Sequence, residues 1–210
     1  MTLQEILINS SAYLDQNIDV PTGDDLDTRV NYANMRVREW EKAYKFNELK
    51  TKYIFTASTL ASVSMPSNFS EIAGNPQELL DGNNNWQEHT QVDPSYVYDQ
   101  TNDYFCYLLG SKYQGYNMVF NKLSVGATMS VDYFRTAATL ATLTDICEVT
   151  DCNYVVQGVI ASVLQARGDD RFPIVEAKAQ QLLSGMIGEN QSSANSSTRA
   201  PKKSYHLGRR

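Results

Sequence analysis

Apolar side chains recur at helical spacing through the first part of the chain. Over residues 2–16 they share one face at intervals of three, four and seven: Leu3, Ile6, Leu7, Tyr13 and Leu14. This predicts an amphipathic helix, after which Pro21 and Gly23 act as breakers. A second set alternates intervals of four and three and predicts a helix of about 22–25 residues: Leu26, Val30, Ala33, Val37, Trp40 and Tyr44. We expect its other face to be mostly solvated: Arg29, Arg36, Arg38, Glu41 and Lys42.

The pattern changes near residue 51 to one that favours strands. Residues 53–55 and the Thr- and Ser-rich residues 56–64 predict two short strands that form a hairpin. Residues 74–103 are rich in Gly, Asn, Asp and Pro, so we expect loops with short strands, one of them around residues 86–90. Further strands are expected at 104–109, 116–121 and 129–134, the last half-buried, and residues 124–127 turn a hairpin between the final two.

Helical spacing returns after residue 150. Asp151 caps a helix whose apolar residues cover much of its circumference, which predicts a central position. Gly158 within it costs about 1 kcal/mol against Ala unless a neighbour packs closely there. Gly168 breaks this helix, and a last one begins near Pro173 and ends at Gly188. Its buried residues are expected to be Val175, Ala179, Leu182, Leu183 and Met186.

This order of elements predicts an α+β fold. The simplest packing joins the two N-terminal and two C-terminal helices into a small helical bundle, with an inserted β-rich domain and an extended C-terminal arm. We place the first half of the bundle at residues 1–50, the β-rich domain at 51–135, the second half of the bundle at 136–188 and the arm at 189–210.

Composition places the chain among globular proteins. The 210 residues suffice for one domain, or one domain with an insertion, and 42% of them are hydrophobic. No apolar run approaches the ~20 residues of a transmembrane helix, and the first residues lack the features of a signal peptide. Three cysteines without a Cys-x-x-Cys pair argue against a disulfide framework or a zinc site and favour a reducing compartment. Thirteen tyrosines against seven phenylalanines suit partly wet interfaces.

Charge is divided unequally along the chain. Residues 190–210 carry five of the 18 basic side chains and no acidic one, which leaves 13 basic against 24 acidic side chains on the rest. We expect this polar tail to be disordered when free. A solvated terminus without function is one interpretation; a docking arm is the other, and Tyr205, His206 and Leu207 among the charges favour docking.

A search for catalytic and metal-binding motifs predicts no catalytic, cofactor or metal site. His89 in the polar loop region and His206 in the tail are expected to be solvated. Asp24, Asp25 and Asp27 are best explained as helix caps, as are Asp169 and Asp170. Cys147 and Cys152 lack further ligands nearby for zinc, and Cys106 is most simply a small core residue.

Residues 26–73 carry a family resemblance. A long helix runs from Leu26 into Trp40, a Thr-rich stretch follows Tyr53-Ile54-Phe55, and Met65-Pro66-Ser67-Asn68-Phe69 comes next. This order resembles the head-to-tail adaptor (connector) proteins of tailed bacteriophages. Residues 129–134 look like that family's last strand, and Thr144-Asp145-Ile146-Cys147 looks like its return into the closing helices. The resemblance spans most of residues 2–188; Met65 replaces the usual Leu, and residues 74–103 match nothing in it.

The resemblance implies a virion protein of the neck, between capsid and tail, assembled in the host bacterial cytoplasm, with no enzymatic activity, cofactor or membrane. Such adaptors form a ring, typically of twelve copies, under the portal protein, and they receive the next neck or tail component while DNA passes through. On this basis the portal contacts are assigned to the tail: Arg199, Lys202, Lys203, Tyr205, Arg209 and Arg210.

Other functions remain open from the sequence. One is a stopper or tail-terminator role, which shares the ring-forming logic. Another is a carboxylate-dependent hydrolase built from the Asp clusters and His89. A third is a nucleic-acid-binding module that uses the basic tail, with a steep dependence of DNA binding on salt.

Overall fold

The computed structural model describes residues 1–58, 61–80, 85–101 and 103–197. The chain is α+β, with four α-helices and two sheets in this part. It divides into two compact units, one formed by residues 1–46 and the chain from 139 onward, the other by residues 47–138. The β-rich unit is thus inserted between the second and third helices, close to the limits of 51 and 135 that the sequence suggested.

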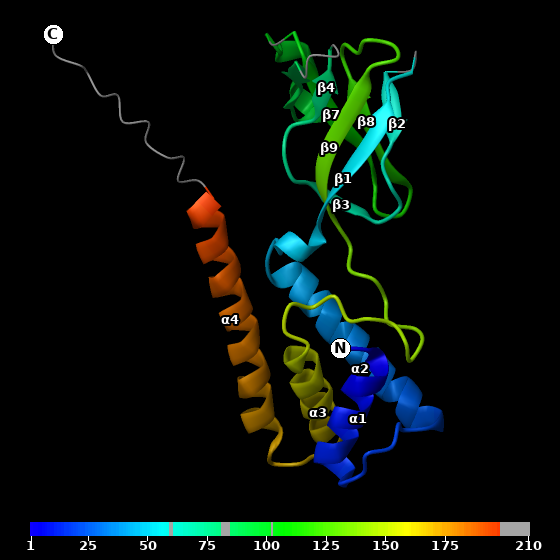
Figure 1. The fold of residues 1–210 in the computed structure, drawn as a ribbon, viewed down its shortest axis with the longest axis vertical. Helices are drawn as coiled ribbons and strands as arrows, with labels where there is room; N and C mark the ends of the chain where they lie inside the picture. The colour runs from blue at the N-terminus through cyan, green and yellow to red at the C-terminus, as the bar shows by residue number, and fades with distance from the viewer. Residues whose placement is uncertain (59–60, 81–84, 102, 198–210) are drawn as a thin grey trace, which may run out of the picture. The chain divides into compact units, whose positions relative to one another are not determined.

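The helical unit is built around one central helix. It contains α1 (Leu3–Asp15), α2 (Gly23–Ala43), α3 (Asn153–Arg167) and α4 (Phe172–Ser197). Thr2 begins α1 with a capping box, because its side chain accepts from Glu5 N while Glu5 Oε2 accepts from Thr2 N. The other three helices all pack against α3 (Figure 1), which confirms the central position that its apolar circumference predicted.

The apolar face of α2 agrees with its periodicity only in part. Ala33, Val37 and Trp40 are buried, and Trp40 stacks on Phe46 with ring centroids 4.6 Å apart. The expected solvation of the other face was wrong for Arg29 and Arg36, which are both buried. Long aliphatic stems let arginines pack in a core when carboxylates receive the guanidinium, and both have such partners here.

Each buried arginine of α2 joins several helices. Arg29 donates from Nη2 to Asp15 of α1 at 2.6 Å and from Nε to Asp25 of α2 at 3.0 Å, and Asp15 also accepts from Arg167 of α3. Seven residues later, Arg36 pairs with Glu176 of α4 at 2.6 Å. Two turns apart on one helix, these arginines tie α2 to each of the other three helices.

The last helix is longer than the sequence indicated. Gly168 ends α3 with a φ of 65°, as predicted, and α4 then begins at Phe172. The prediction that Gly188 ends α4 was wrong, because the helix continues to Ser197. Gly188 lacks the positive φ that ends helices, and the Ser192 hydroxyl bonds the Glu189 carbonyl within the same helix. Residues 189–197, which we assigned to the arm, therefore belong to α4.

The inserted unit consists of two sheets. The first has the order β1-β9-β4-β5, with β3 also paired to β9; the second has the order β2-β8-β7-β6. Short 3-10 helices lie at η1 (Asn47–Leu49) and η2 (Pro94–Asp99). The strands are β1 (Lys50–Thr56), β2 (Ser62–Ser64), β3 (Phe69–Ile72), β4 (Gln77–Leu79), β5 (Trp86–Glu88), β6 (Thr90–Gln91), β7 (Phe105–Ser111), β8 (Gly115–Phe120) and β9 (Thr128–Arg135).

Side chains from both sheets share one core. Met129, Val131 and Tyr133 point inward from β9, as their alternation predicted, and Met118 and Phe120 come from β8. Cys106 of β7 is fully buried among them, which confirms it as a small core residue. This common core places β9 at the centre of the first sheet, with β1 on one side and β3 and β4 on the other.

Both predicted hairpins were wrong. β1 pairs with β9 in the first sheet, whereas β2 pairs with β8 in the second. Residues 124–127 do make a turn, with Ala127 N donating to Ser124 O, but this turn carries the chain from one sheet to the other. Alternating apolar residues predict a strand without selecting its partner, and here the shared core favoured strands that change sheets.

Candidate functional site

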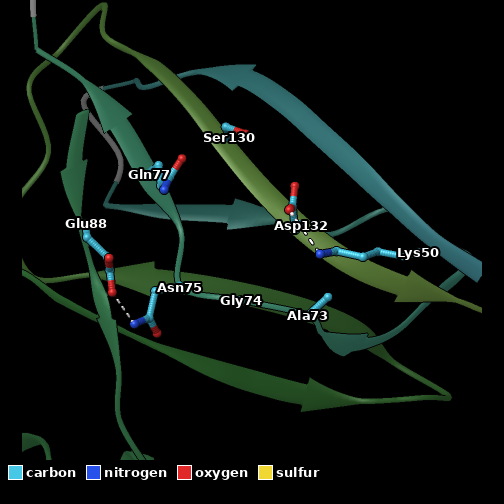
Figure 2. Close-up of a pocket in the computed structure, with 8 residues that line it drawn as sticks. All are labelled: Lys50, Ala73, Gly74, Asn75, Gln77, Glu88, Ser130 and Asp132. Carbon is cyan, nitrogen blue, oxygen red and sulfur yellow. Dashed lines mark hydrogen bonds and ion pairs between the residues drawn. The ribbon is translucent and has the colours of Figure 1, made fainter. Parts of the chain in front are cut away.

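A polar pocket of about 210 Å³ opens beside β9 in the inserted unit (Figure 2). Residues 74–76 leave the edge of β9 beside it, between the β3 and β4 pairings. Ser130 and Asp132 of β9 face it, since residues two apart on a strand share a face. The remaining lining residues come from neighbouring strands and this connection: Lys50, Ala73, Gly74, Asn75, Gln77 and Glu88.

The charges of the pocket are already paired. Asp132 lies 3.5 Å from Lys50 Nζ and 3.8 Å from Lys52 Nζ, and Asn75 donates to Glu88 (Figure 2). These ion pairs are substantially exposed, so each contributes at most about 1 kcal/mol to stability. Among the residues that the structure describes, Ser130 contributes a hydroxyl to the lining, and Asp132 and Glu88 contribute carboxylates. The arrangement suits binding of a small polar group.

His89 lies in the interior of the inserted unit, so the expectation of a solvated loop residue was wrong. Its Nε2 is 3.0 Å from Glu78 Oε2, and both side chains are fully buried. The rings of Tyr104 and Phe120 meet it edge-on. Sequence gave no signal for this pair, because the partners are eleven residues apart on either side of a loop.

The buried carboxylate of Glu78 has partners on both oxygens. Burial alone would raise the pKa of Glu78, but hydrogen bonds from Ser124 and His89 hold it below its usual value. Among the described residues, His89 Nδ1 has no hydrogen-bond partner. A neutral ring with its proton on Nε2 buries only an unpaired acceptor there, whereas a protonated ring would bury an unpaired N–H. The pair thus anchors β4 to the residues around Ser124.

Aspartates of the two acidic clusters accept hydrogen bonds from arginines nearby in the sequence. Asp25 accepts from Arg29, and Asp169 accepts from Arg171 Nη2 at 2.7 Å. The Asp169–Arg171 bonds lower the pKa of Asp169 to about 2. Across the residues that the structure describes, no group of three metal-ligating side chains lies together.

The six residues assigned to portal contact lie outside the described residues: Arg199, Lys202, Lys203, Tyr205, Arg209 and Arg210. What the structure does supply is the element before them, α4, which continues nine residues beyond Gly188. In the helical unit, α4 runs alongside α3, and its C-terminal part extends past the N-terminal end of α3 (Figure 1).

Aromatic side chains are exposed on both units. Tyr98 of η2 and Tyr113 at the turn between β7 and β8 are almost fully exposed, and Tyr96 and Trp86 are more than a third exposed. On the helical unit, Tyr13 is exposed, which its expected place on the buried face did not predict, and Ile174 of α4 is largely exposed. Exposed aromatic residues are enriched at protein interfaces.

Comparisons with known proteins leave the family open. No protein-family model matches the chain, and no curated protein matches it. Within the described ranges, no helix has the length and apolar character needed to cross a bilayer.

Proposed function

We propose that this protein is a head-to-tail adaptor of a tailed bacteriophage: a ring-forming virion protein that docks on the portal through its C-terminal tail and holds the next neck or tail component. The observation that carries the proposal is the order of the chain. A helical unit is interrupted by a β-rich unit, and its last helix leads directly into a basic tail.

The length of α4 suits an element that presents a docking tail. At 1.5 Å per residue, its 26 residues span about 39 Å. Its buried residues, Val175, Ala179 and Met186, occupy the first 15 residues of the helix, where it lies against α3. The remainder carries the chain away from that contact before the basic residues begin. A basic tail at such a position can dock on a partner, and a ring multiplies one weak contact into firm attachment.

The charge distribution fits a channel for DNA better than a DNA-binding protein. The first 189 residues carry 24 acidic against 13 basic side chains, so they repel phosphates and favour passage without adhesion. The tail has the opposite sign and is free to meet a partner. A ring also needs two different adhesive faces on each copy, and the exposed aromatic residues on both units suit such contacts.

The test is a truncation after Ser197, which removes residues 198–210 and leaves α4 complete. The full chain and the truncated chain are each mixed with portal-bearing, DNA-filled heads of the phage that encodes it, and bound protein is measured after sedimentation. We expect the truncation to abolish binding while helical circular dichroism and the oligomeric state stay unchanged.

A charge variant distinguishes the effect of the tail's positive charges from the effect of its length. Arg199, Lys202, Lys203, Arg209 and Arg210 are changed to Gln in the full chain, which keeps every residue beyond α4. Loss of binding here would assign docking to the charges. Undiminished binding by the truncated chain, or failure of the full chain to bind portal-bearing heads, would exclude the adaptor role as proposed.

A further inference from the structure

Two cysteines meet at the start of α3. Cys147 follows the bridge between Thr2 and Ile146, and Cys152 is the N-cap residue of the helix. The chain between them turns back, so that Cys152 Sγ lies 3.7 Å from Cys147 O and 3.4 Å from Val149 O. Both hydrogen bonds are donated by the Cys152 thiol, which lies against the backbone of Cys147. Cys147 is buried and Cys152 is half-buried, so reagents from solution reach Cys152 first.

The two sulfurs differ in their readiness to react. The contact with the Cys147 side chain lowers the pKa of Cys152, although burial opposes this. The same contact, together with burial, raises the pKa of Cys147. The N-terminal end of α3 favours a negative sulfur at Cys152 as well. Cys152 is thus both the more accessible of the two sulfurs and the more readily deprotonated.

We propose that Cys147 and Cys152 form a reversible disulfide within the chain when the protein meets a small-molecule disulfide such as oxidised glutathione. The Cys152 thiolate attacks one sulfur of glutathione disulfide, whose S–S bond breaks, and the first glutathione leaves as a thiolate. The Cys147 sulfur then attacks the Cys152 sulfur of this mixed disulfide and displaces the second glutathione. The two glutathione thiolates take up the protons released by the two cysteines. The protein loses two electrons, and the small disulfide is reduced to two thiols.

The third cysteine is an internal control. Cys106 is buried in the core of the inserted unit, and burial raises its pKa to about 12. Trypsin, which cleaves after Lys and Arg, places Cys147 and Cys152 on one peptide, residues 136–167, and Cys106 on another, residues 53–112. One digest therefore reports the proposed site and the control separately.

The experiment titrates the full chain with rising ratios of oxidised to reduced glutathione at neutral pH. After an acid quench, free thiols are alkylated in denaturant, and the tryptic peptides are weighed. We expect peptide 136–167 to lose the mass of two hydrogens and to escape alkylation, while Cys106 stays alkylatable; added reductant should reverse the change. The same oxidation in the urea-unfolded chain should need a ratio at least about tenfold higher, because the native contact is lost.

Two variants separate the roles of the sulfurs. Cys147→Ser retains a donor but cannot resolve the mixed disulfide, so it should accumulate a glutathione adduct on Cys152. Cys152→Ser should leave Cys147 as a free thiol. The proposal is overturned if wild-type peptide 136–167 remains doubly alkylated, if it stops at a stable glutathione adduct, or if folded and unfolded chains oxidise at the same ratio. These three outcomes use the wild-type chain and do not depend on how the variants fold.

Discussion

Gly158 lies in the middle of α3, directly against the side chain of Arg36. A Cβ at this position would lie 2.5 Å from Arg36 Cγ, far inside contact distance. Arg36 has little freedom to move aside, because its guanidinium is held by Glu39, Ser162 and both carboxylate oxygens of Glu176. The absence of a side chain at residue 158 therefore makes room for a buried charge that joins α2 to α4.

We expect Gly158→Ala to lower the free energy of unfolding of the helical unit by about 1–3 kcal/mol, since overpacking outweighs the gain in helix propensity. Urea denaturation followed by helical circular dichroism measures the change. Gly188→Ala is the matched control: that residue is also helical, and nothing lies within 4 Å of the added Cβ. The control should be neutral or stabilising by up to about 1 kcal/mol. Equal stability of the Gly158 variant and wild type would contradict the close contact.

Asp15 makes the stability of the helical unit sensitive to acid. Its hydrogen bond from Arg29 holds the pKa of Asp15 below its usual value; burial opposes this effect, and the hydrogen bond from Arg167 adds to it. A carboxyl whose pKa is lower in the folded chain stabilises the fold above its unfolded pKa of about 3.9, and that contribution disappears as the pH falls through the lower folded value.

Asp15→Asn should therefore be less stable than wild type near neutral pH, and the difference should shrink below about pH 4. Stability is measured by urea denaturation at a series of pH values. Asp27→Asn, an exposed residue of α2, serves as the control and should show little effect at any pH. A difference between Asp15→Asn and wild type that stays constant from neutral to acidic pH would remove Asp15 from the acid response.

At the level of elements, Asn34 fixes the chain that returns from the inserted unit. Its amide donates to Leu140 O at 2.9 Å and accepts from Leu140 N at 2.8 Å. The side chain thereby pairs with a loop residue as a neighbouring strand would. The segment that leads toward α3 is held on α2 by this double contact and not by regular secondary structure.

Asn34→Asp replaces the donor with an oxygen that faces Leu140 O. We expect a loss of about 1–3 kcal/mol in stability and faster hydrogen exchange at the Leu140 amide. Asn31→Asp, an exposed position on the same helix, controls for the added charge. Unchanged exchange at Leu140 would show that other contacts hold the segment.

The helices were predictable because a helix that buries one face repeats apolar residues at intervals of three and four along the sequence. α1 agrees with its expected limits of 2–16 within one residue, α2 has 21 residues against the expected 22–25, and α3 has the central position that its composition indicated. The apolar periods did not reveal which polar residues would also be buried. Arg29 and Arg36 pair with residues of other helices, and Glu78 pairs with His89 across a loop. Such pairs join residues from different elements, so the spacing of residues within one element does not predict them.

The strand partners and the end of α4 also could not be predicted from local sequence patterns. β1 and β2 are neighbours in sequence but belong to different sheets, because both sheets close over one core. Gly188 has no local feature that distinguishes a helical glycine from a terminal one. The polar pocket beside β9 lies where residues 74–76 leave the sheet, which is a consequence of strand register.

At the level of the whole molecule, the inserted unit has what a separate domain requires. Its core is formed entirely by residues 57–133, so it needs no side chain from the helices. β1 and β9 are antiparallel partners, with Lys50 opposite Phe134. The two ends of the insertion are therefore adjacent in the sheet, which is the arrangement in which an insertion folds without distorting its host.

A fragment of residues 47–138 should accordingly fold alone, with a dispersed amide NMR spectrum and one cooperative unfolding transition. Val131→Asp, which places a charge in the fully buried centre of β9, should unfold this fragment. In the full chain the same substitution should leave the helical circular dichroism of the other unit intact, because the buried cluster around Val131 contains residues of the inserted unit alone. A random-coil spectrum for the wild-type fragment, or loss of the helices in the full-length Val131→Asp chain, would mean that the units depend on each other to fold.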